Sequence, residues 1–240
     1  MGQPSPASNT PDAAFHGRVT VNGIVLAADC LGALYWREEG LLVVADLHLE
    51  KGSSFARRGQ LLPPYDTTET LSRVARLIAR YAPRTVIALG DNFHDGGGPA
   101  RLSAQDRASL AALQRGRDWI WIAGNHDPDP ADGIGGTFAA MLSIGALAFR
   151  HIPSRDAPDG EIAGHLHPVA RVAQRGRAVS RRCFASDGKA LVMPAFGAYT
   201  GGLNIRDRAF AAVFGARKFS AHMLGEDRLY AFAASRCLSD

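Results

Sequence analysis

The chain has 240 residues, of which 46% are hydrophobic and 21% charged, a composition that suits one large soluble domain. No apolar stretch reaches the roughly 18 residues that a membrane span requires, so we expect no membrane partner. The net charge of +4 comes almost wholly from arginine. It favours a polyanionic partner, although a high genomic arginine content would explain it equally well.

The N-terminal segment and the cysteines indicate the domain boundaries and the redox environment of the protein. Residues 1–17 are rich in Pro, Ser and Ala without the features of a signal peptide, so we expect a disordered N-terminal tail followed by one domain over residues 18–235. Cys30, Cys183 and Cys237 form no CxxC pair and are odd in number. They argue against a disulfide framework and suit a reducing cytoplasm.

The first half of the chain predicts alternating strands and helices. Paired strands are expected over residues 18–34 and a buried strand over 40–46, followed by a polar loop over 51–65. Asp66 or Thr67 can cap a helix that runs to Tyr81. The cycle then repeats, and this pattern is typical of βαβ units. The repeat consists of a strand over 85–89, a glycine-rich loop over 96–98, a helix over 103–114 and a strand over 119–123.

Helices are not predicted after about residue 147. Short strands are expected there instead, in a mainly antiparallel sheet stacked on the first. Their ranges are 168–173, 180–185, 190–195, 209–214, 218–224 and 229–232.

Five apolar runs stop where metal-binding residue types follow. The runs are 41–45 before Asp46 and His48, 85–89 before Asp91, 119–123 before Asn125 and His126, 146–149 before His151, and 162–163 before His165 and His167. Buried strands of an α/β sheet end on the same side, so these side chains should converge at one sheet edge. A glycine just before a ligand lets the backbone turn where a Cβ would clash.

This ordered set resembles the signature of the calcineurin-like metallophosphoesterases. The motifs are Asp-Leu-His, Gly-Asp, Gly-Asn-His-Asp, a lone His and Gly-His-Leu-His. The resemblance implies an α/β fold, a four-layer αββα sandwich in which two mixed β-sheets are flanked by helices.

A narrower resemblance is to the bacterial DNA-ligase-associated phosphoesterases, the PdeM type of endonuclease. Residues 46–52, 63–67, 164–168 and 194–204 carry it. Asn92 departs from the pattern, because a small residue is expected there, but it does not occupy a ligand position.

The resemblance implies two divalent metal ions and a solvent-derived nucleophile. One ion would be bound by Asp46, His48, Asp91 and His167, and the other by Asp91, Asn125, His151 and His165. Such a mixed oxygen and nitrogen shell suits manganese, our first expectation, or iron, zinc or cobalt. His151 lacks a glycine or aspartate marker, so a structural surface histidine is the alternative at that position.

Further residues are candidates for catalysis and substrate binding. His126 is expected beside the metals as the acid that protonates the departing oxygen, and Asp127 is expected to orient its imidazole and raise its pKa. Lys51, Arg57 and Arg58 could hold a substrate phosphate. His94 is a further substrate-site candidate, with an ordinary loop residue as the alternative.

The function expected from these features is that of a dinuclear metal-dependent phosphodiesterase, a cytoplasmic nuclease that acts on DNA in a ligase-associated repair system. A functional association with a DNA ligase and a helicase is implied, and strand edges of the second sheet could pair in a homo-oligomer. The alternatives are a 2′,3′-cyclic nucleotide phosphodiesterase, a phosphomonoesterase and a non-catalytic scaffold of the same fold.

Overall fold

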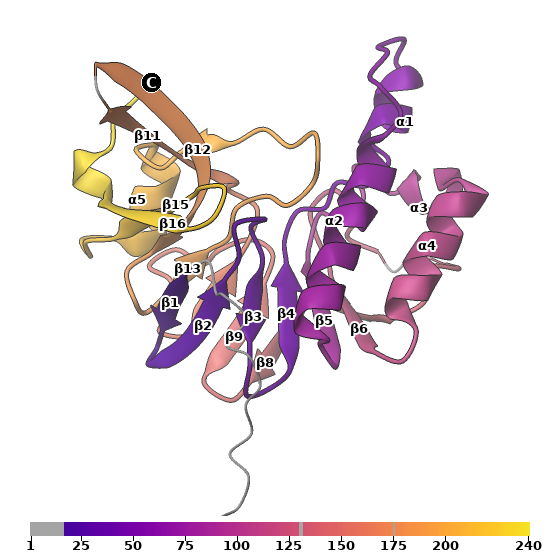
Figure 1. The fold of residues 1–240 in the computed structure, drawn as a ribbon, viewed down its shortest axis with the longest axis horizontal. Coiled ribbons are helices and arrows are strands. Elements are labelled where there is room, and N and C mark those ends of the chain that lie inside the picture. Colours follow the sequence, from indigo (N-terminus) through magenta and orange to yellow (C-terminus); the bar gives the residue numbers. More distant parts are fainter. Residues whose placement is uncertain (1–16, 130–131, 175) are drawn as a thin grey trace, which may run out of the picture.

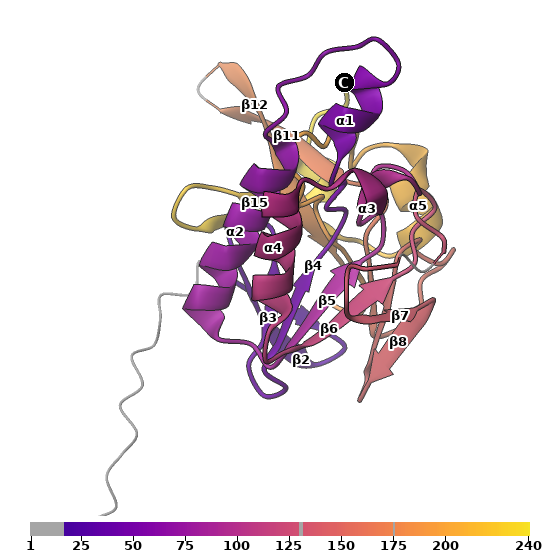
Figure 2. The same ribbon diagram turned by 90° about the vertical axis from the view of Figure 1, so that its right-hand side faces the viewer.

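Two mixed β-sheets lie face to face with helices on their outer faces, as Figures 1 and 2 show. The computed structural model describes residues 17–129, 132–174 and 176–240. The predicted tail therefore lies outside the described residues except for Gly17. Among the helices of this described part, none combines the length and apolarity needed to cross a bilayer.

The first sheet is formed by the N-terminal part of the chain. Its described strands are β1 (Arg18–Val21), β2 (Ile24–Ala28), β3 (Leu34–Trp36), β4 (Leu41–Val44), β5 (Thr85–Leu89), β6 (Asp118–Ile122) and β7 (Thr137–Ala139), which neighbour one another in chain order. Strands β1 to β4 pair antiparallel, whereas β4 to β7 pair parallel. The parallel half matches the predicted βαβ units.

The second sheet follows in sequence from the edge of the first. Its described strands are β8 (Met141–Ile144), β9 (Leu147–Arg150), β10 (Glu161–Ala163), β11 (Pro168–Gln174), β12 (Arg177–Ser186), β13 (Leu191–Val192), β14 (Leu203–Asn204), β15 (Ser220–Leu224) and β16 (Leu229–Ala233). The sheet is mainly antiparallel, as predicted, but β10 pairs parallel with both β9 and β13. Their carboxyl ends therefore lie together.

Short and long helices connect the strands. They are α1 (Lys51–Ala56), α2 (Asp66–Tyr81), α3 (Gly98–Arg101), α4 (Ala104–Gln114) and α5 (Arg208–Phe214), with a 3-10 turn at Ala234–Arg236. Helix α2 ends at Tyr81 as predicted, but its N-cap is Tyr65 rather than Asp66 or Thr67, and no side chain caps it. Ser103 caps α4 by accepting from the Asp106 amide.

Three hydrophobic layers hold the sandwich together. Strand β4 is buried on both faces: Leu41 and Val43 pack between the two sheets, whereas Leu42 and Val44 pack toward α2 and α4. The third layer, which includes Phe210, lies between the second sheet and α5. This order of helix, sheet, sheet and helix is the predicted four-layer arrangement.

Two segments differ from their predicted state. Residues 209–214 were expected as a strand but form α5, because Phe210, Val213 and Phe214 follow a helical spacing and Asp207 caps the first turn. Residues 51–56 were expected within a loop but form α1. A contact distant in sequence stabilises that helix start, since the Gly52 amide donates to Asp66 Oδ2.

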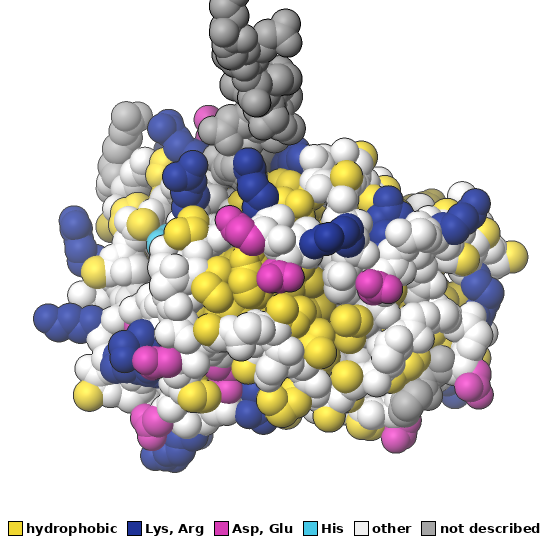
Figure 3. All heavy atoms as spheres, turned by 90° about the horizontal axis from the view of Figure 1, so that it is seen from below, with side chains coloured by type: hydrophobic (Ala, Val, Ile, Leu, Met, Phe, Trp, Pro, Cys, Tyr) yellow, Lys and Arg dark blue, Asp and Glu magenta, His cyan; other side chains and the backbone are white. Residues whose placement is uncertain are grey.

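Helix α1 and the β11–β12 hairpin project from the same end of the molecule in both ribbon views. Figure 3 shows the opposite end. There, hydrophobic side chains gather near the middle, and side chains of Lys and Arg alternate around them with those of Asp and Glu.

Candidate metal centre

The predicted ligands lie where the strands of both sheets end. Strands β4, β5 and β6 place Asp46, Asp91 and Asn125 at the edge of the first sheet, and β9 and β10 place His151 and His165 at the edge of the second. The sequence predicted a cluster at one sheet edge, whereas the structure builds it from two. Stacking of the sheets brings the two edges together.

Asp46, His48 and His167 form the first cluster of ligand atoms. Their nearest donor atoms lie within 4.8 Å of one another. His167 Nε2 lies 3.2 Å from Asp46 Oδ1 and 3.4 Å from His48 Nε2. Asp91 Oδ2 is 3.7 Å from His48 Nε2, so Asp91 approaches this cluster with one carboxylate oxygen.

A second cluster surrounds His151 Nε2. That atom lies 3.2 Å from Asp91 Oδ1, 3.0 Å from Asn125 Oδ1 and 3.2 Å from His165 Nδ1. Asp91 therefore turns Oδ1 toward this cluster and Oδ2 toward the first. A carboxylate placed in this way has the geometry of a bridge between two cations.

The surroundings of the site keep His48 and Asp91 in the deprotonated forms that metal ions bind. Burial lowers the pKa of His48 to about 3 despite the nearby charge of Asp91, so this imidazole is neutral at pH 7. Burial alone would raise the pKa of Asp91, but its hydrogen bond with His151 and the surrounding histidines hold it well below its ordinary value. A neutral imidazole and an ionised carboxylate are the forms that bind metals.

The backbone adopts an unfavourable conformation at most of these ligands. Asp46, His48, Asp91, His165 and His167 have φ between 43° and 70° and are five of the nine described non-glycine residues with positive φ. This left-handed region costs about 1–3 kcal/mol for each such residue and concentrates at functional sites. These strained backbone conformations lower the stability of the fold but direct the ligand side chains toward the site.

Glycines beside the ligands allow close approach of the backbone. A Cβ at Gly124 would lie 2.1 Å from the Asp91 amide nitrogen and 2.4 Å from Asp91 Oδ1. A Cβ at Gly90 would lie 2.3 Å from His151 Cγ, and Gly90 also has a φ of 75°. At Gly124 the need is for space rather than for a sharp turn.

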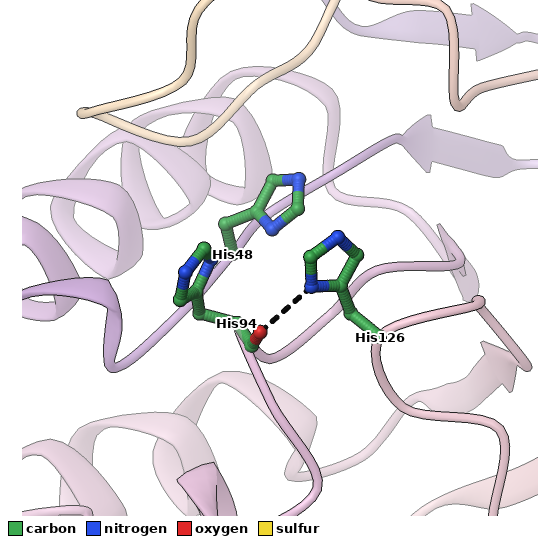
Figure 4. A group of neighbouring side chains, drawn as sticks. All are labelled: His48, His94 and His126. Atoms are coloured by element: carbon green, nitrogen blue, oxygen red, sulfur yellow. Dashed lines mark hydrogen bonds between the residues drawn. The ribbon is translucent and has the colours of Figure 1, made fainter. Parts of the chain in front are cut away.

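His126 stands beside both clusters with its Nε2 turned toward them. Figure 4 shows its ring together with those of His48 and His94, whose ligand atoms form a third group within 4.8 Å. His126 Nε2 lies 3.9 Å from Asp91 Oδ2, and the side chain is 39% exposed. Its Nδ1 donates to the His94 carbonyl oxygen at 2.8 Å, which leaves Nε2 free for proton transfer.

Asp127 has a different partner from the predicted one. Its Oδ2 accepts hydrogen bonds from the backbone amides of Asn92 and Phe93, at 2.9 and 3.2 Å. The His94 carbonyl, and not Asp127, therefore orients the His126 imidazole. Burial raises the pKa of Asp127 to about 6, and its carboxylate fastens the loop that carries Asp91.

Asn92 and Phe55 are two site residues that sequence reasoning did not assign. The Asn92 amide donates to the Ile122 carbonyl at 3.0 Å and joins the ends of β5 and β6. The Phe55 ring lies 5.5 Å from the His94 ring, which stacks on His126 at 5.3 Å. The only sequence signals were an asparagine where a small residue was expected and a phenylalanine in a polar segment.

The candidate substrate residues lie on and near α1. Lys51 Nζ donates to the Tyr199 carbonyl at 2.9 Å, and burial lowers the pKa of Lys51. Arg57 and Arg58 are exposed and, with Ser54 and Asp95, line a hollow of about 320 Å³. His94 is the member of this set nearest to the ligand clusters, at a ring distance of 5.6 Å from His48.

Comparisons with known proteins identify the family. Residues 41–171 match the calcineurin-like phosphoesterase model, which is more than half of the chain. The Pseudomonas putida nuclease MPE shares 26% sequence identity with this chain, at a TM-score of 0.67, over 90% of this chain and 99% of that one. Yfce, a phosphoesterase from E. coli, is 15% identical over 81% and 98% of the two chains, with a TM-score of only 0.39. No curated protein matches the chain. The family match confirms the predicted resemblance, and this chain belongs to the calcineurin-like phosphoesterase family.

Proposed function

We propose that the protein is a dinuclear metal-dependent phosphodiesterase that cleaves DNA in the cytoplasm, within a ligase-associated repair system. The observation that carries the proposal is the position of Asp91, whose two carboxylate oxygens face two separate groups of ligand atoms. A single-metal site would not need a carboxylate whose two oxygens face separate groups of ligand atoms.

The donor atoms fit two divalent cations. Asp46, His48, Asp91 and His167 would hold one ion, and Asp91, Asn125, His151 and His165 the other. Mixed carboxylate, amide and imidazole donors suit manganese, the ion we propose, or iron, zinc or cobalt. When bound, such a pair grips phosphate oxygens and makes water acidic enough to attack phosphorus near neutral pH.

His126 is the residue of this chain that we assign to proton transfer. The His94 carbonyl holds the proton on Nδ1, so the acid is the doubly protonated imidazolium form of His126, which donates its second proton from Nε2, the atom that faces the ligand clusters. That proton goes to the alkoxide oxygen that departs from phosphorus. General acid catalysis of this kind contributes about 10²- to 10⁴-fold to a rate.

Two observations support DNA as the substrate. The similar Pseudomonas structure is that of a nuclease, and residues 51–61, which follow the ligand candidate His48, contain three basic residues and no Asp or Glu. Lys51, Arg57 and Arg58 would neutralise backbone phosphates. A phosphomonoesterase or a cyclic nucleotide phosphodiesterase shares such a metal centre and differs in the walls around it, so rates on defined substrates separate the three.

The test is hydrolysis by the purified full-length chain with manganese. We expect bis-p-nitrophenyl phosphate to be cleaved faster than p-nitrophenyl phosphate, and circular single-stranded DNA to be opened. The Asp91→Asn variant should lose both activities, whereas the matched Asp118→Asn variant, at an exposed aspartate outside the site, should keep them.

Three outcomes would contradict the proposal. A preference for the monoester would favour the phosphomonoesterase, and rapid turnover of 2′,3′-cyclic AMP without DNA cleavage would favour the cyclic phosphodiesterase. A chain that hydrolyses none of these substrates but binds a protein partner would be a scaffold. Association with a ligase, a helicase or a second copy is a further part of the proposal, tested by co-purification and sedimentation.

A further inference from the structure

Positive charge is concentrated in two segments of the chain. Residues 51–61, here the helical arm, and residues 168–186, here the hairpin arm, together contain eight Lys and Arg residues and no Asp or Glu. The remaining residues carry 19 Lys and Arg against 23 Asp and Glu. The net positive charge of the protein therefore resides in these two arms, and the rest of the chain is net negative.

Both arms leave the polypeptide directly at the ligand clusters. The helical arm begins three residues after His48, and the hairpin arm begins immediately after His167. Figures 1 and 2 show α1 and the β11–β12 hairpin at the same end of the molecule. The opposite end carries both signs of charge (Figure 3). A nucleic-acid strand bound at the metal centre would thus lie close to one arm from each sheet.

The distal part of the hairpin arm has no other strand beside it. Strands β11 and β12 pair from Val169↔Arg182 to Gln174↔Arg177. At the base of the arm, β14 pairs with Pro168 and Val169, and β15 pairs with Cys183 to Ser186. Between these anchor points the described residues of the two strands pair with no other strand, although the Arg171 carbonyl accepts from the Leu238 amide. The arm is therefore a two-stranded ribbon that projects from the sheet.

The exposed arginines of both arms have no acidic partner in the described part of the chain. Arg57, Arg58, Arg177 and Arg181 are exposed, and no described carboxylate lies within ion-pair distance of them. Some arginines elsewhere are ion-paired, as Arg101 is with Asp95. A high genomic arginine content would explain the number of arginines, but it does not explain why the two arms contain no Asp or Glu.

The remaining described arginines of the hairpin arm have structural roles. Arg182 donates to the Ala195 carbonyl at 2.8 Å, and Arg171 donates to the Ser239 carbonyl at 3.4 Å. Arg177 and Arg181 make no such long-range contact among the described residues, although Arg181 reaches the adjacent Ser180 carbonyl. These two side chains are therefore the ones available to an outside ligand.

We propose that the hairpin arm is the second half of a nucleic-acid interface, in which Arg177 and Arg181 bind backbone phosphates on one side of the cleaved bond. Arg57 and Arg58 of the helical arm bind phosphates on the other side. The partner is a nucleic-acid backbone, because unpaired guanidinium groups on a projecting ribbon match a flexible polyanion. The inference rests on the proposed function, since it gives the nuclease its strand-binding surface.

The test measures DNA binding separately from catalysis. Binding of fluorescein-labelled oligo-dT is followed by anisotropy in EDTA, so that no strand is cut, and hydrolysis of bis-p-nitrophenyl phosphate is measured with manganese. Arg177→Gln/Arg181→Gln should weaken binding about tenfold at low salt and reduce the slope of log affinity against log salt by about 1 per arginine. Hydrolysis of the small diester should stay unchanged, because the arm does not touch the reacting group.

Matched variants separate specific loss of charge from misfolding. Arg155→Gln/Arg208→Gln removes two exposed arginines outside the arms and should leave binding unchanged. Arg177→Lys/Arg181→Lys keeps the charge and should retain the salt slope of the wild type. The thermal midpoint of each variant checks the fold.

Several results would overturn the inference. Unchanged DNA affinity in Arg177→Gln/Arg181→Gln, with diester hydrolysis intact, would refute the interface and leave the proposed function standing. A loss of DNA affinity in the Arg155→Gln/Arg208→Gln control equal to that in Arg177→Gln/Arg181→Gln would show a non-specific effect of net charge. Binding to phosphatidylserine vesicles that needs Arg177 and Arg181, without a matching dependence for DNA, would assign the arm to a membrane surface. Absence of diester hydrolysis in the wild type would instead contradict the proposed function, while the binding assay in EDTA would still report on the arm.

Discussion

The His94 carbonyl oxygen accepts a hydrogen bond from His126 Nδ1 at 2.8 Å, and the two imidazole rings stack with their centroids 5.3 Å apart. A carbonyl cannot donate, so Nδ1 keeps its proton, and the second proton of the imidazolium form, the one available for transfer, lies on Nε2. One residue thus fixes both the tautomer and the tilt of the proposed acid.

Replacing His126 with alanine should remove the proton donor without removing a metal ligand. We expect the rate of DNA cleavage to fall by about 10²- to 10⁴-fold, as for the loss of a general acid. Metal analysis of the purified variant should still find two ions per chain. An unchanged rate would refute the role of His126, and loss of metal would place it among the ligands.

Replacing His94 with alanine should have a smaller effect, because the bond to His126 comes from the main chain. The variant loses the stacked ring but keeps the carbonyl acceptor, so we expect the turnover number to fall by less than in His126→Ala. Side-by-side turnover numbers on one DNA substrate are the measurement. A loss as large as that of His126→Ala would show that the His94 ring itself takes part in the reaction.

Gly124→Ala should disrupt the second ligand cluster. The added methyl group would lie 2.1 Å from the Asp91 amide nitrogen, so the backbone that carries Asp91 would have to move. Overpacking of this kind costs about 1–3 kcal/mol. We expect a lower metal content and a lower thermal midpoint. The control is Gly96→Ala, where a Cβ meets nothing within 4 Å. Normal metal binding in Gly124→Ala would disprove the close-packing argument.

Manganese should stabilise the wild type more than it stabilises Asp91→Asn. An ion that binds only the folded state at 100 times its dissociation constant adds about 2.7 kcal/mol to the free energy of unfolding. Asp91 faces both clusters, so its replacement should reduce the effect of manganese on the thermal midpoint at both sites. Asp118→Asn is the control. An equal rise of the thermal midpoint with manganese in the wild type, Asp91→Asn and Asp118→Asn would mean that Asp91 binds no ion.

Alkaline unfolding should depend on Tyr81, which lies away from the site. Its hydroxyl donates to Asp29 Oδ2 at 2.7 Å. Burial, assisted by the bond to Asp29, raises the pKa of Tyr81 above its ordinary value of 10.0. A raised pKa in the folded state means that the stabilisation is complete below pH 10 and is lost as pH rises through the folded-state pKa.

The Tyr81→Phe variant tests this pH dependence. It should be about 1 kcal/mol less stable than the wild type at pH 7, because a buried hydrogen bond is lost. Above pH 10 the wild type should lose stability more steeply than the variant, so the difference between them should shrink. Urea unfolding of both proteins at pH 7 and above pH 10 measures the difference in their free energies of unfolding. Parallel curves over the whole range would contradict the role of Tyr81.

Much of the fold could be predicted because local patterns and burial agree. Helix α2 has Leu71, Val74 and Leu77 on one face, and β4 is an apolar run that is buried on both faces. In contrast, α5 is a run of seven residues, too short for its helical spacing and its Asp207 cap to exclude a buried strand before the packing of Phe210 is known. Helix α1 depends on a contact with Asp66, which no local pattern reveals.

The sequence by itself determined which residue types follow each strand, and hence the ligand candidates, because strand ends and chemistry are both local properties. Only the tertiary structure decided that two sheets contribute to one centre, that the His94 carbonyl and not Asp127 orients His126, and that two basic arms project from the same end. These relationships join residues that are distant in the chain. Their distances are set by the pairing of strands within a sheet and by the stacking of the two sheets, which no neighbouring residues encode.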